Sequence, residues 1–322
     1  MNAPTLRPDV LRLGSRRSPM AIAQSRLVAN MITERTGREV EIVGVTTLGD
    51  VSRAHLTQIG GTGVFVSALR EALLNGEIDF AVHSLKDLPA SQPADVALAA
   101  VPPRDDPRDA LIARDGAKLA DLPAGGRIGT GSPRRAAQLL ALRGDLRCVP
   151  IRGNAGTRMA KIEAGEVDAV VLACAGLARI KRLDVVAEVF NPEEMLPAAG
   201  QGSLAVECRA EDDQLTRLLG TINHEPSMAS ATAERSLLEA LAARCSAPVA
   251  AYAMYRPVED DLDMQAAAMS ADGGTILRAH ASAASGQAWQ LGQDLAAELL
   301  RAGARELIEV PQATADSEND AQ

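Results

Sequence analysis

The heptad GEIDFAV at residues 76–82 recurs in altered form as GEVDAVV at residues 165–171. In each copy a Gly-Glu pair, typical of a tight turn, precedes an apolar run that predicts a buried strand. A second pair of segments is related in the same way, LGSRRSP at residues 13–19 and IGTGSPRR at residues 128–135. Each leads from a short strand into a Ser-Pro pair, which favours the start of a helix.

The two pairs of repeated segments are separated by different lengths of chain. A solenoid would keep a fixed period, so the pattern predicts two similarly built α/β lobes with unequal insertions. Chance similarity stays the alternative explanation for matches this short. The fold class that we predict is α/β, with two lobes around a cleft and a smaller α+β domain at the C-terminal end.

Two proline-rich or glycine-rich segments mark the predicted crossings between the lobes, PPRDDP at residues 102–107 and the segment 197–202. A chain of 322 residues is long enough for two or three domains. We predict a first lobe of residues 1–102 and 203–222, a second lobe of residues 103–202, a third domain of residues 223–311 and a disordered acidic tail of residues 312–322.

Periodicity and turn residues predict individual elements at both ends of the chain. We expect a strand at residues 10–13 and a helix at about 20–33 that is capped by Ser18. In the third domain we expect helices at about 228–243 and 288–301, with a hairpin turn at DGG, residues 272–274.

The composition limits the classes of partner. The chain has 42 acidic and 33 basic residues, a net charge of −9, which argues against a nucleic-acid partner. The N-terminal residues contain no apolar segment, and no run approaches the roughly eighteen apolar residues of a membrane span. The sequence therefore predicts a cytoplasmic protein with no membrane partner.

The four cysteines are Cys148, Cys174, Cys208 and Cys245, and they lie far apart without CxxC pairs. This spacing predicts neither a disulfide framework nor a metal site. The first three lie in apolar runs and are expected to be buried small side chains. Cys245 differs because it lies in a predicted loop between a helix and a strand. From position alone, an unreactive loop cysteine is the favoured interpretation.

Six arginines lie in or beside turns rich in Gly, Ser and Thr: Arg16, Arg17, Arg134, Arg135, Arg152 and Arg158. Loops at strand ends meet at one cleft in α/β lobes, and guanidinium groups beside helix starts suit carboxylates or phosphates. The pattern predicts a ligand with several carboxylates. Any one of these arginines is as readily explained as a solvated surface residue or as part of a structural ion pair.

The segment HSLKDLP, residues 83–89, follows the predicted buried strand of the first lobe. Lys86 can anchor an anion, and Asp87 can stabilise a cation or move a proton. A strand-end Asp is more often a turn former, and His83 is better explained as a structural hydrogen-bonding group.

Taken together, these segments resemble the porphobilinogen deaminase family over nearly the whole chain. The resemblance also rests on residues 105–110, 151–154, 156–158, 196–197, 200–202 and 207–209. It implies two lobes folded like periplasmic binding proteins and a third domain that carries the cofactor cysteine. It also implies a deaminating hydroxymethylbilane synthase, a monomer that condenses four porphobilinogen molecules with loss of ammonia and then hydrolyses the linear tetrapyrrole from the enzyme.

By the same resemblance, Cys245 holds one dipyrromethane cofactor per chain through a thioether, and Asp87 stabilises positive charge at pyrrole nitrogens. The implied cofactor-binding residues are Ser84, Lys86, Thr130, Ser132, Arg134 and Arg135. The implied substrate-binding residues are Arg16, Ser18, Arg152, Gly153, Arg158, Arg179 and Gln201.

The sequence departs from the family pattern at three places. Thr62 replaces a lysine in the predicted lid loop at residues 60–63, so one expected cation is absent there. Gly131 follows Thr130 where a serine is common, and Ala243-Arg244 precede Cys245 in place of a glycine pair. These departures concern individual ligand contacts and the surroundings of the thiol.

The main alternative is a non-catalytic protein that binds a solute or effector in a similar two-lobed cleft. The absence of a signal peptide and of an N-terminal helix-turn-helix pattern counts against this alternative. A nucleotide-binding enzyme is less favoured, because GGTG at residues 60–63 lacks the Lys-Ser/Thr ending of a P-loop.

Overall fold

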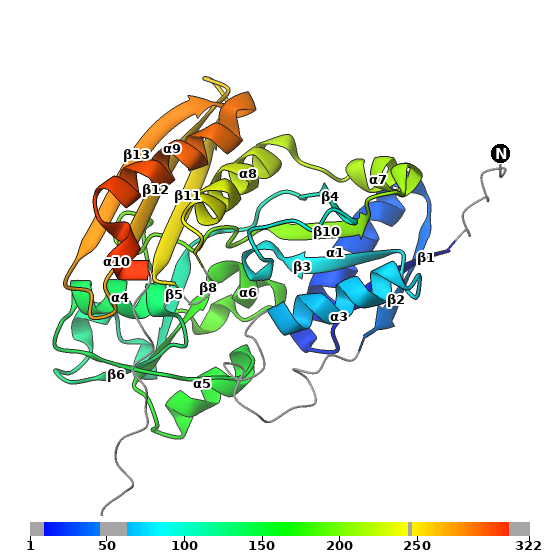
Figure 1. The fold of residues 1–322 in the computed structure, drawn as a ribbon. Helices are drawn as coiled ribbons and strands as arrows, with labels where there is room; N and C mark the ends of the chain where they lie inside the picture. Colours follow the sequence, from blue (N-terminus) through cyan, green and yellow to red (C-terminus); the bar gives the residue numbers. More distant parts are fainter. Residues whose placement is uncertain (1–9, 46–62, 244–246, 309–322) are drawn as a thin grey trace, which may run out of the picture.

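A computed structural model describes residues 10–45, 63–243 and 247–308 of the chain. These residues form three separate sheets, each with its own helices (Figure 1). Residues 60–62 of the predicted lid, Cys245 with its neighbour Arg244, and the predicted tail lie outside the described residues.

The first lobe contains a five-stranded sheet in the order β2-β1-β3-β10-β4. Its strands are β1 (Val10–Ser15), β2 (Glu39–Gly44), β3 (Phe80–Ser84), β4 (Val96–Ala100) and β10 (Leu204–Arg209). Strands β2, β1 and β3 are parallel, whereas β10 is antiparallel to both of its neighbours. The helices of this lobe are α1 (Pro19–Thr36), α3 (Gly63–Leu74) and α7 (Asp213–Gly220).

The second lobe contains a five-stranded sheet in the order β7-β6-β8-β5-β9. Its strands are β5 (Asp109–Ala113), β6 (Arg127–Gly129), β7 (Arg147–Val149), β8 (Ala169–Ala173) and β9 (Glu188–Val189). Strands β7, β6 and β8 are parallel, and β5 is antiparallel to β8 and β9. The helices are α4 (Pro133–Leu142), α5 (Ala155–Glu163) and α6 (Cys174–Arg179).

The two sheets have the same strand order and the same strand directions, so the predicted pair of similar lobes is confirmed. In each sheet the fourth strand follows a crossing segment: β5 comes after the chain leaves the first lobe, and β10 after it leaves the second. The chain therefore passes twice between the lobes. The predicted domain limits in residue numbers stay a prediction.

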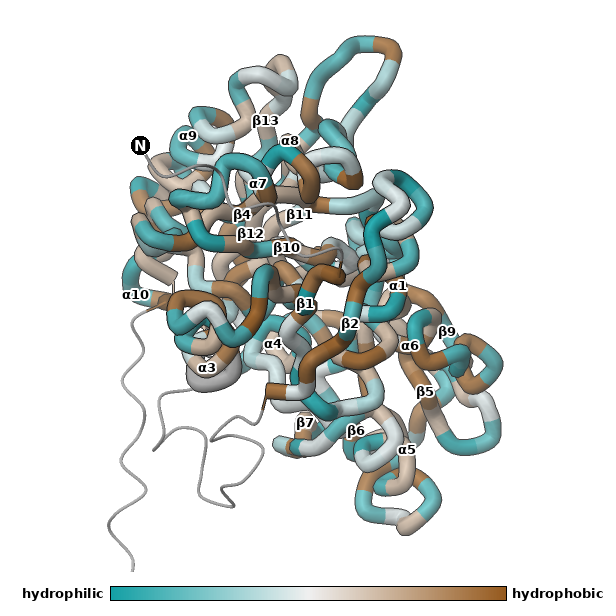
Figure 2. The backbone as a smooth tube through the Cα atoms, turned by 90° about the vertical axis from the view of Figure 1, so that its right-hand side faces the viewer, coloured by the Kyte–Doolittle hydropathy of each residue, from teal (hydrophilic) through white to brown (hydrophobic). Residues whose placement is uncertain are grey.

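The third domain is an antiparallel sheet of β11 (Val249–Arg256), β12 (Asp261–Met269) and β13 (Ile276–Ala284). Helices α8 (Glu225–Ala240) and α9 (Ala288–Arg301) pack together against it, and α10 (Ala304–Ile308) follows. The predicted hairpin is confirmed, since residues 270–275 join β12 to β13, and the predicted last helix is α9. Strands such as β1, β2 and β5 are rich in hydrophobic residues (Figure 2).

Helix starts follow from the Ser-Pro pairs, as predicted. Ser18 caps α1 by accepting a hydrogen bond from the Ala21 N–H at 3.3 Å, and Pro19 occupies the first helical position. Ser132 caps α4 in the same way, accepting from the Arg135 N–H at 3.4 Å. Both caps place a helix N-terminus directly after a strand of the parallel set.

In the part of the chain that is described, no helix combines the length and apolar character required to cross a membrane.

Gly202 is required where the second crossing segment passes the first. Its φ is +92°, and a Cβ atom at this position would lie 2.4 Å from the Asp105 carbonyl oxygen. We expect Gly202→Ala to lower the free energy of unfolding by at least ~1–3 kcal/mol, the usual cost of such backbone strain. Equilibrium urea unfolding measures this change.

The matched control is Gly220→Ala at the end of α7, where a Cβ atom would meet nothing within 4 Å. Alanine in a helix is expected to leave stability unchanged or slightly raised. Equal unfolding midpoints for Gly202→Ala and the wild type would contradict the prediction.

Candidate active site

The candidate site lies where strands of the two lobes end. Strand β3 ends at Ser84 and continues into a short 3-10 helix, η1 (Leu85–Asp87), while β6 ends at Gly129 shortly before α4. Since β3 is parallel to β1, and β6 to β8, the loops that follow these strands lie at the carboxyl edges of their sheets. The crossing segments bring the two edges together, as the following contacts show.

A buried carboxylate, Asp109, holds the two arginines at the start of α4. Asp109 is 0% exposed and accepts hydrogen bonds from Arg134 Nη2 at 2.7 Å and from Arg135 Nη2 at 2.7 Å and Nε at 3.0 Å. Burial alone would raise the pKa of the Asp109 carboxyl, but the charges of Arg134 and Arg135 outweigh it and hold that pKa well below its usual range.

Gln201 connects this ion pair to Lys86 in the first lobe. The Gln201 side chain donates through Nε2 to Asp109 Oδ1 at 2.9 Å and accepts through Oε1 from Lys86 Nζ at 3.1 Å. Burial, with repulsion from Arg135, lowers the pKa of Lys86 to about 8, against the attraction of Asp87 and Asp109. Lys86 therefore lies in a site that is already rich in positive charge.

Asp87 differs from Asp109 because it is exposed, at the end of η1. Its negative charge favours the protonated forms of both Lys86 and Arg158. Arg158, half-buried on α5, donates through Nε to the Gly153 carbonyl at 2.9 Å. Burial lowers the pKa of Arg158, as does its proximity to Arg135. Asp87 is thus a carboxylate that faces cations and remains accessible to a ligand.

Other predicted site residues shape the loops around this cluster. Ser84 accepts a hydrogen bond from Gln24 Nε2 of α1 at 2.7 Å, which ties the end of β3 to the helix that Ser18 caps. Thr130 is buried and accepts from the Ser132 N–H at 3.2 Å. Arg16 is half-buried between β1 and α1.

Gly131, which stands where a serine is common in the family, allows a close approach of two loops beside Thr130. A Cβ atom at Gly131 would lie 2.9 Å from the Ile151 carbonyl oxygen, so the loop after β7 approaches closely here. That loop carries Arg152 and Gly153, both exposed.

Arg179 and Cys245 are among the predicted residues that no described contact joins to the cluster. Arg179 donates through Nε to Asp105 at 2.9 Å and through Nη2 to the Gly202 carbonyl at 2.6 Å, so it binds the two crossing segments. Cys245 lies outside the described residues. Its described neighbours Ala243 and Ala247 pack against the core of the third domain.

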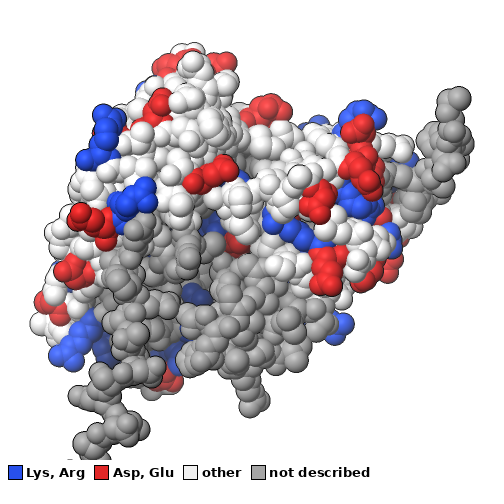
Figure 3. All heavy atoms as spheres, in the orientation of Figure 1, with Lys and Arg blue, Asp and Glu red and all other residues white. Residues whose placement is uncertain are grey.

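The cations of the cluster outnumber its carboxylates. Its charged members are Lys86, Asp87, Asp109, Arg134, Arg135 and Arg158. Moreover, Arg134 is 3% exposed, and its buried Nε has no hydrogen-bond partner among the residues described. Buried donors are rarely left unpaired, so this arrangement fits a ligand that brings carboxylates. On the face drawn in Figure 3, by contrast, basic and acidic side chains are interspersed.

The remaining described cysteines are poor nucleophiles. Cys174 and Cys208 are buried, as expected, but the same expectation is wrong for Cys148, which is half-buried at the edge strand β7. Burial raises the pKa of the Cys174 thiol to about 11 and also raises that of Cys148. Thiolate is the reactive form, so neither is suited to form a covalent adduct at neutral pH.

His83 has the structural environment that the sequence analysis predicted. It is buried, and its Nε2 lies 3.3 Å from Oε2 of Glu207, which is 0% exposed on β10. Glu207 also accepts from Arg70 of α3 at 2.7 and 3.0 Å and from Gln92 at 2.9 Å. This network fixes the strand that leads into Lys86 and Asp87.

No pattern in the sequence indicated a role for Asp109, Glu207 or Gln24. Asp109 and Glu207 lie within segments that carry the family resemblance, but nothing local distinguishes a buried counter-charge from a turn residue. Their roles follow from partners that are 25 to 137 positions away in the chain.

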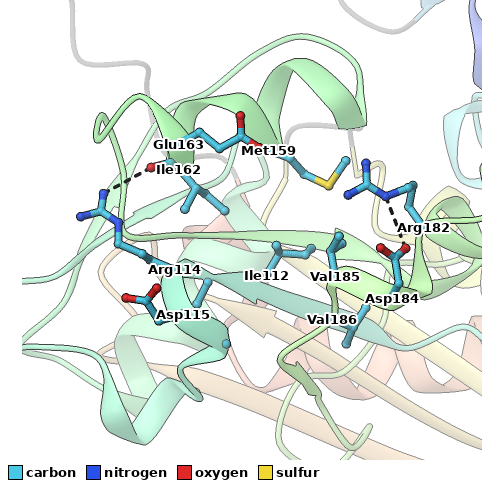
Figure 4. A pocket seen from close by; sticks show the side chains of 12 residues that line it. Ile112, Arg114, Asp115, Met159, Ile162, Glu163, Arg182, Asp184, Val185 and Val186 are labelled. Carbon is cyan, nitrogen blue, oxygen red and sulfur yellow. Dashed lines mark hydrogen bonds and ion pairs between the residues drawn. The ribbon is translucent and has the colours of Figure 1, made fainter.

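A separate pocket of about 600 Å³ lies in the second lobe between β5, α5 and a 3-10 helix, η4 (Leu183–Val185) (Figure 4). Apolar side chains such as Ile112 and Ile162 line part of it. Two of its charged side chains are already paired: Arg182 forms an ion pair with Asp184, and Arg114 donates a hydrogen bond to the Ile162 carbonyl. None of the predicted site residues lines this pocket.

Comparison with known proteins identifies two matching family models. The model described as porphobilinogen deaminase, dipyromethane cofactor binding domain, matches residues 11–217. The model of the porphobilinogen deaminase C-terminal domain matches residues 228–301.

Curated relatives match over most of their length. The chain is 56% identical over 305 residues to a porphobilinogen deaminase of Thermobifida fusca (strain YX), with 92% of this chain and 95% of that protein covered. It is 50% identical over 309 residues to porphobilinogen deaminase 1 of Streptomyces coelicolor, with 92% and 97% covered.

Two solved structures that resemble the chain have low sequence identity to it. The methionine-binding protein MetQ covers 67% of this chain and 91% of its own, with 12% identity and a TM-score of 0.44. A periplasmic substrate-binding protein of an ABC transporter from Coxiella burnetii covers 70% and 96%, with 16% identity and a TM-score of 0.41. Similarity this low supports no conclusion about fold or ligand.

The Glu207 network yields a prediction on stability. Burial would raise the pKa of Glu207, but its interactions with the nearby His83 and with Arg70 lower it to about 2, against an ordinary value of 4.5. A carboxyl with a lowered folded-state pKa stabilises the fold fully above pH 4.5, and this contribution is lost as the pH falls towards 2. We expect Glu207→Gln to cost about 3–5 kcal/mol at pH 7, because Arg70 loses its partner.

Urea unfolding at pH 7 and at decreasing pH measures both effects, and the difference between variant and wild type should shrink in acid. The matched control is Glu166→Gln, which removes an exposed ion pair with Lys161 and should change stability by less than about 1 kcal/mol. A pH-independent difference for Glu207→Gln would refute the assignment.

Proposed function

The chain belongs to the porphobilinogen deaminase family, and we propose that its reaction takes place at the cationic cluster around Lys86, with Asp87 as the catalytic carboxylate. It is a transferase of tetrapyrrole and heme biosynthesis that condenses porphobilinogen and uses a dipyrromethane cofactor. The observation that supports the proposed site is an exposed carboxylate beside an excess of buried and half-buried cations.

Asp87 has the environment that the chemistry requires. When porphobilinogen loses ammonia, positive charge develops at its pyrrole nitrogen, and the carboxylate of Asp87 would stabilise that charge through a hydrogen bond. Because Asp87 is exposed, its carboxylate is accessible to a pyrrole N–H. Its charge interacts with the neighbouring cations Lys86 and Arg158.

The cations would bind the acetate and propionate groups that every pyrrole ring of the substrate carries. Lys86, Arg134 and Arg135 surround Asp109, and Arg134 retains a buried donor without a partner among the described residues. Arg158, with the exposed Arg152 and Gly153, would line the opposite loop, and Arg16 and Ser18 the start of α1. Ser84, Thr130 and Ser132 shape the same loops.

The dipyrromethane would be held by Cys245 through a thioether, with its carboxylates on Lys86, Arg134 and Arg135. When bound, it supplies the free α-carbon to which the first porphobilinogen unit is joined. The described residues fit such a group, because their excess positive charge suits an anion and the buried Arg134 Nε has no acceptor among them. The high thiol pKa of Cys174 disfavours that cysteine as the attachment point.

The complete reaction that we propose is the addition of four porphobilinogen units, each with loss of ammonia, followed by hydrolysis that releases hydroxymethylbilane. We further propose that the protein is a cytoplasmic monomer without a nucleic-acid partner. The net charge of −9 supports the last point, because binding of nucleic acid requires a basic surface.

Cys245→Ser tests the attachment point. Serine oxygen is a far weaker nucleophile than a thiolate, so we expect the variant to lack the adduct and to form no product. Intact-mass spectrometry should give the wild type the mass of its polypeptide plus one dipyrromethane, and Cys245→Ser the polypeptide mass alone. Cys148→Ser is the control and should keep the adduct. An adduct on Cys245→Ser, or none on the wild type, would exclude the proposed attachment.

Asp87→Asn tests the catalytic carboxylate. The amide keeps the shape but cannot compensate positive charge, so we expect kcat to fall about 100- to 1,000-fold while the adduct remains. Product formation from porphobilinogen and intact mass are measured on the same preparation. Asp184→Asn, which changes an exposed aspartate of the second lobe, should be fully active. Undiminished turnover by Asp87→Asn would show that Asp87 does not have this role.

A further inference from the structure

Asp109 is too deeply buried to touch a substrate, yet its described side-chain partners are residues of the candidate site. It is 0% exposed, and its carboxylate accepts from Arg134, Arg135 and Gln201. Arg134 and Arg135 are themselves oriented by second bonds, Arg134 Nη1 to the Leu196 carbonyl at 2.6 Å and Arg135 Nη1 to the Val171 carbonyl at 3.0 Å.

The location of Asp109 explains why one carboxylate reaches so many groups. It is the first residue of β5, where the chain completes its first crossing. Gln201 lies on the second crossing and donates through Nε2 both to Asp109 and to the Pro107 carbonyl, at 2.9 and 2.7 Å. The same amide accepts from Lys86 Nζ. The contacts of Asp109 thus extend from the second lobe to Lys86 in the first.

We propose that Asp109 is a positioning residue for this reaction: it orients the guanidinium groups of Arg134 and Arg135 and, through the Gln201 amide, the ammonium group of Lys86. This inference rests on the proposed function only for its effect on turnover. Its effect on Lys86 can be measured without any activity.

The charges around Lys86 give the proposal a specific consequence. The described charged groups that act on Lys86 are Asp87 of η1, Asp109 of β5, and Arg134 and Arg135 of α4. Arg158 of α5 interacts with Arg135 and Asp87. Removing the Asp109 charge leaves the arginines to repel the Lys86 ammonium, so the pKa of Lys86 falls below its present value of about 8. A purely structural loss would not move this pKa in that direction.

The test is Asp109→Asn, which keeps the shape of the side chain and removes its charge. Loaded wild-type protein and variant are treated with acetic anhydride over a series of pH values, and acetylation of Lys86 is quantified by peptide mass spectrometry. Only the neutral amine reacts, so the pH midpoint for Lys86 should move to lower pH in Asp109→Asn. Lys118, which is exposed, serves as the internal reference.

The matched control is Asp79→Asn. Asp79 is also nearly buried and accepts two bonds from the Arg12 side chain, at 2.9 and 3.3 Å, but it precedes β3 whereas Lys86 follows it. This variant loses a comparable ion pair and should leave the Lys86 midpoint unchanged.

A charge-balanced pair separates charge from folding. Asp109→Asn combined with Arg134→Gln removes one charge of each sign, so its Lys86 midpoint should lie between that of Asp109→Asn and that of Arg134→Gln. If Asp109→Asn alone does not fold, the double variant is compared with Arg134→Gln, and its midpoint should be the lower of the two.

Turnover gives the second readout. In Asp109→Asn the alkaline limb of the rate of product formation should move to lower pH together with the Lys86 midpoint, and KM should rise because the arginines are no longer held. A Lys86 midpoint equal to that of the wild type would overturn the proposal. If the Lys86 midpoint is lower in Asp109→Asn than in the wild type, but the wild type carries no adduct and forms no product, the proposal on Lys86 is retained and the proposed function is refuted.

Discussion

A single carboxylate that is shared by two arginines makes the interior of the candidate site possible. Arg134 and Arg135 are 3% and 6% exposed, and burial of two guanidinium groups is strongly unfavourable without a partner. Asp109 supplies that partner with short bonds to both groups. Because one negative charge opposes two positive charges, the site keeps an excess of cations, which suits the ligand with carboxylates that we propose.

The topology of the lobes places this carboxylate correctly. In each lobe, one strand of the sheet directly follows a crossing between the lobes: β5 in the second lobe and β10 in the first. The residues at those crossings, Asp109 and Gln201, therefore lie between the two sets of strand-end loops. An α/β lobe with a self-contained sheet would have no such residue at this point. The double crossing thus couples the architecture to the electrostatics of the candidate site.

Three acidic residues near the site have different roles because their burial differs. Glu207 is fully buried and fixes β3 and α3 through His83 and Arg70. Asp109 is fully buried and compensates the arginines. Asp87 alone of these three is exposed, which suits the carboxylate proposed to meet the substrate. The third domain, whose α8 and β11 flank the segment with Cys245, shares buried contacts with the rest of the chain, since its core includes Ala199 and its strands pack on Ala137 and Leu196.

The sequence alone determined the paired lobes, the helix starts at Ser18 and Ser132, and the structural role of His83. These features depend on caps, periodicity and turns, which involve residues close together in the chain. Only the tertiary structure decided that Arg134 and Arg135 are buried on Asp109, and that Gln201 links them to Lys86. An arginine in a turn has the same local pattern whether it is solvated or buried. Its partner is chosen by the packing of strands far apart in the chain, which no local pattern records.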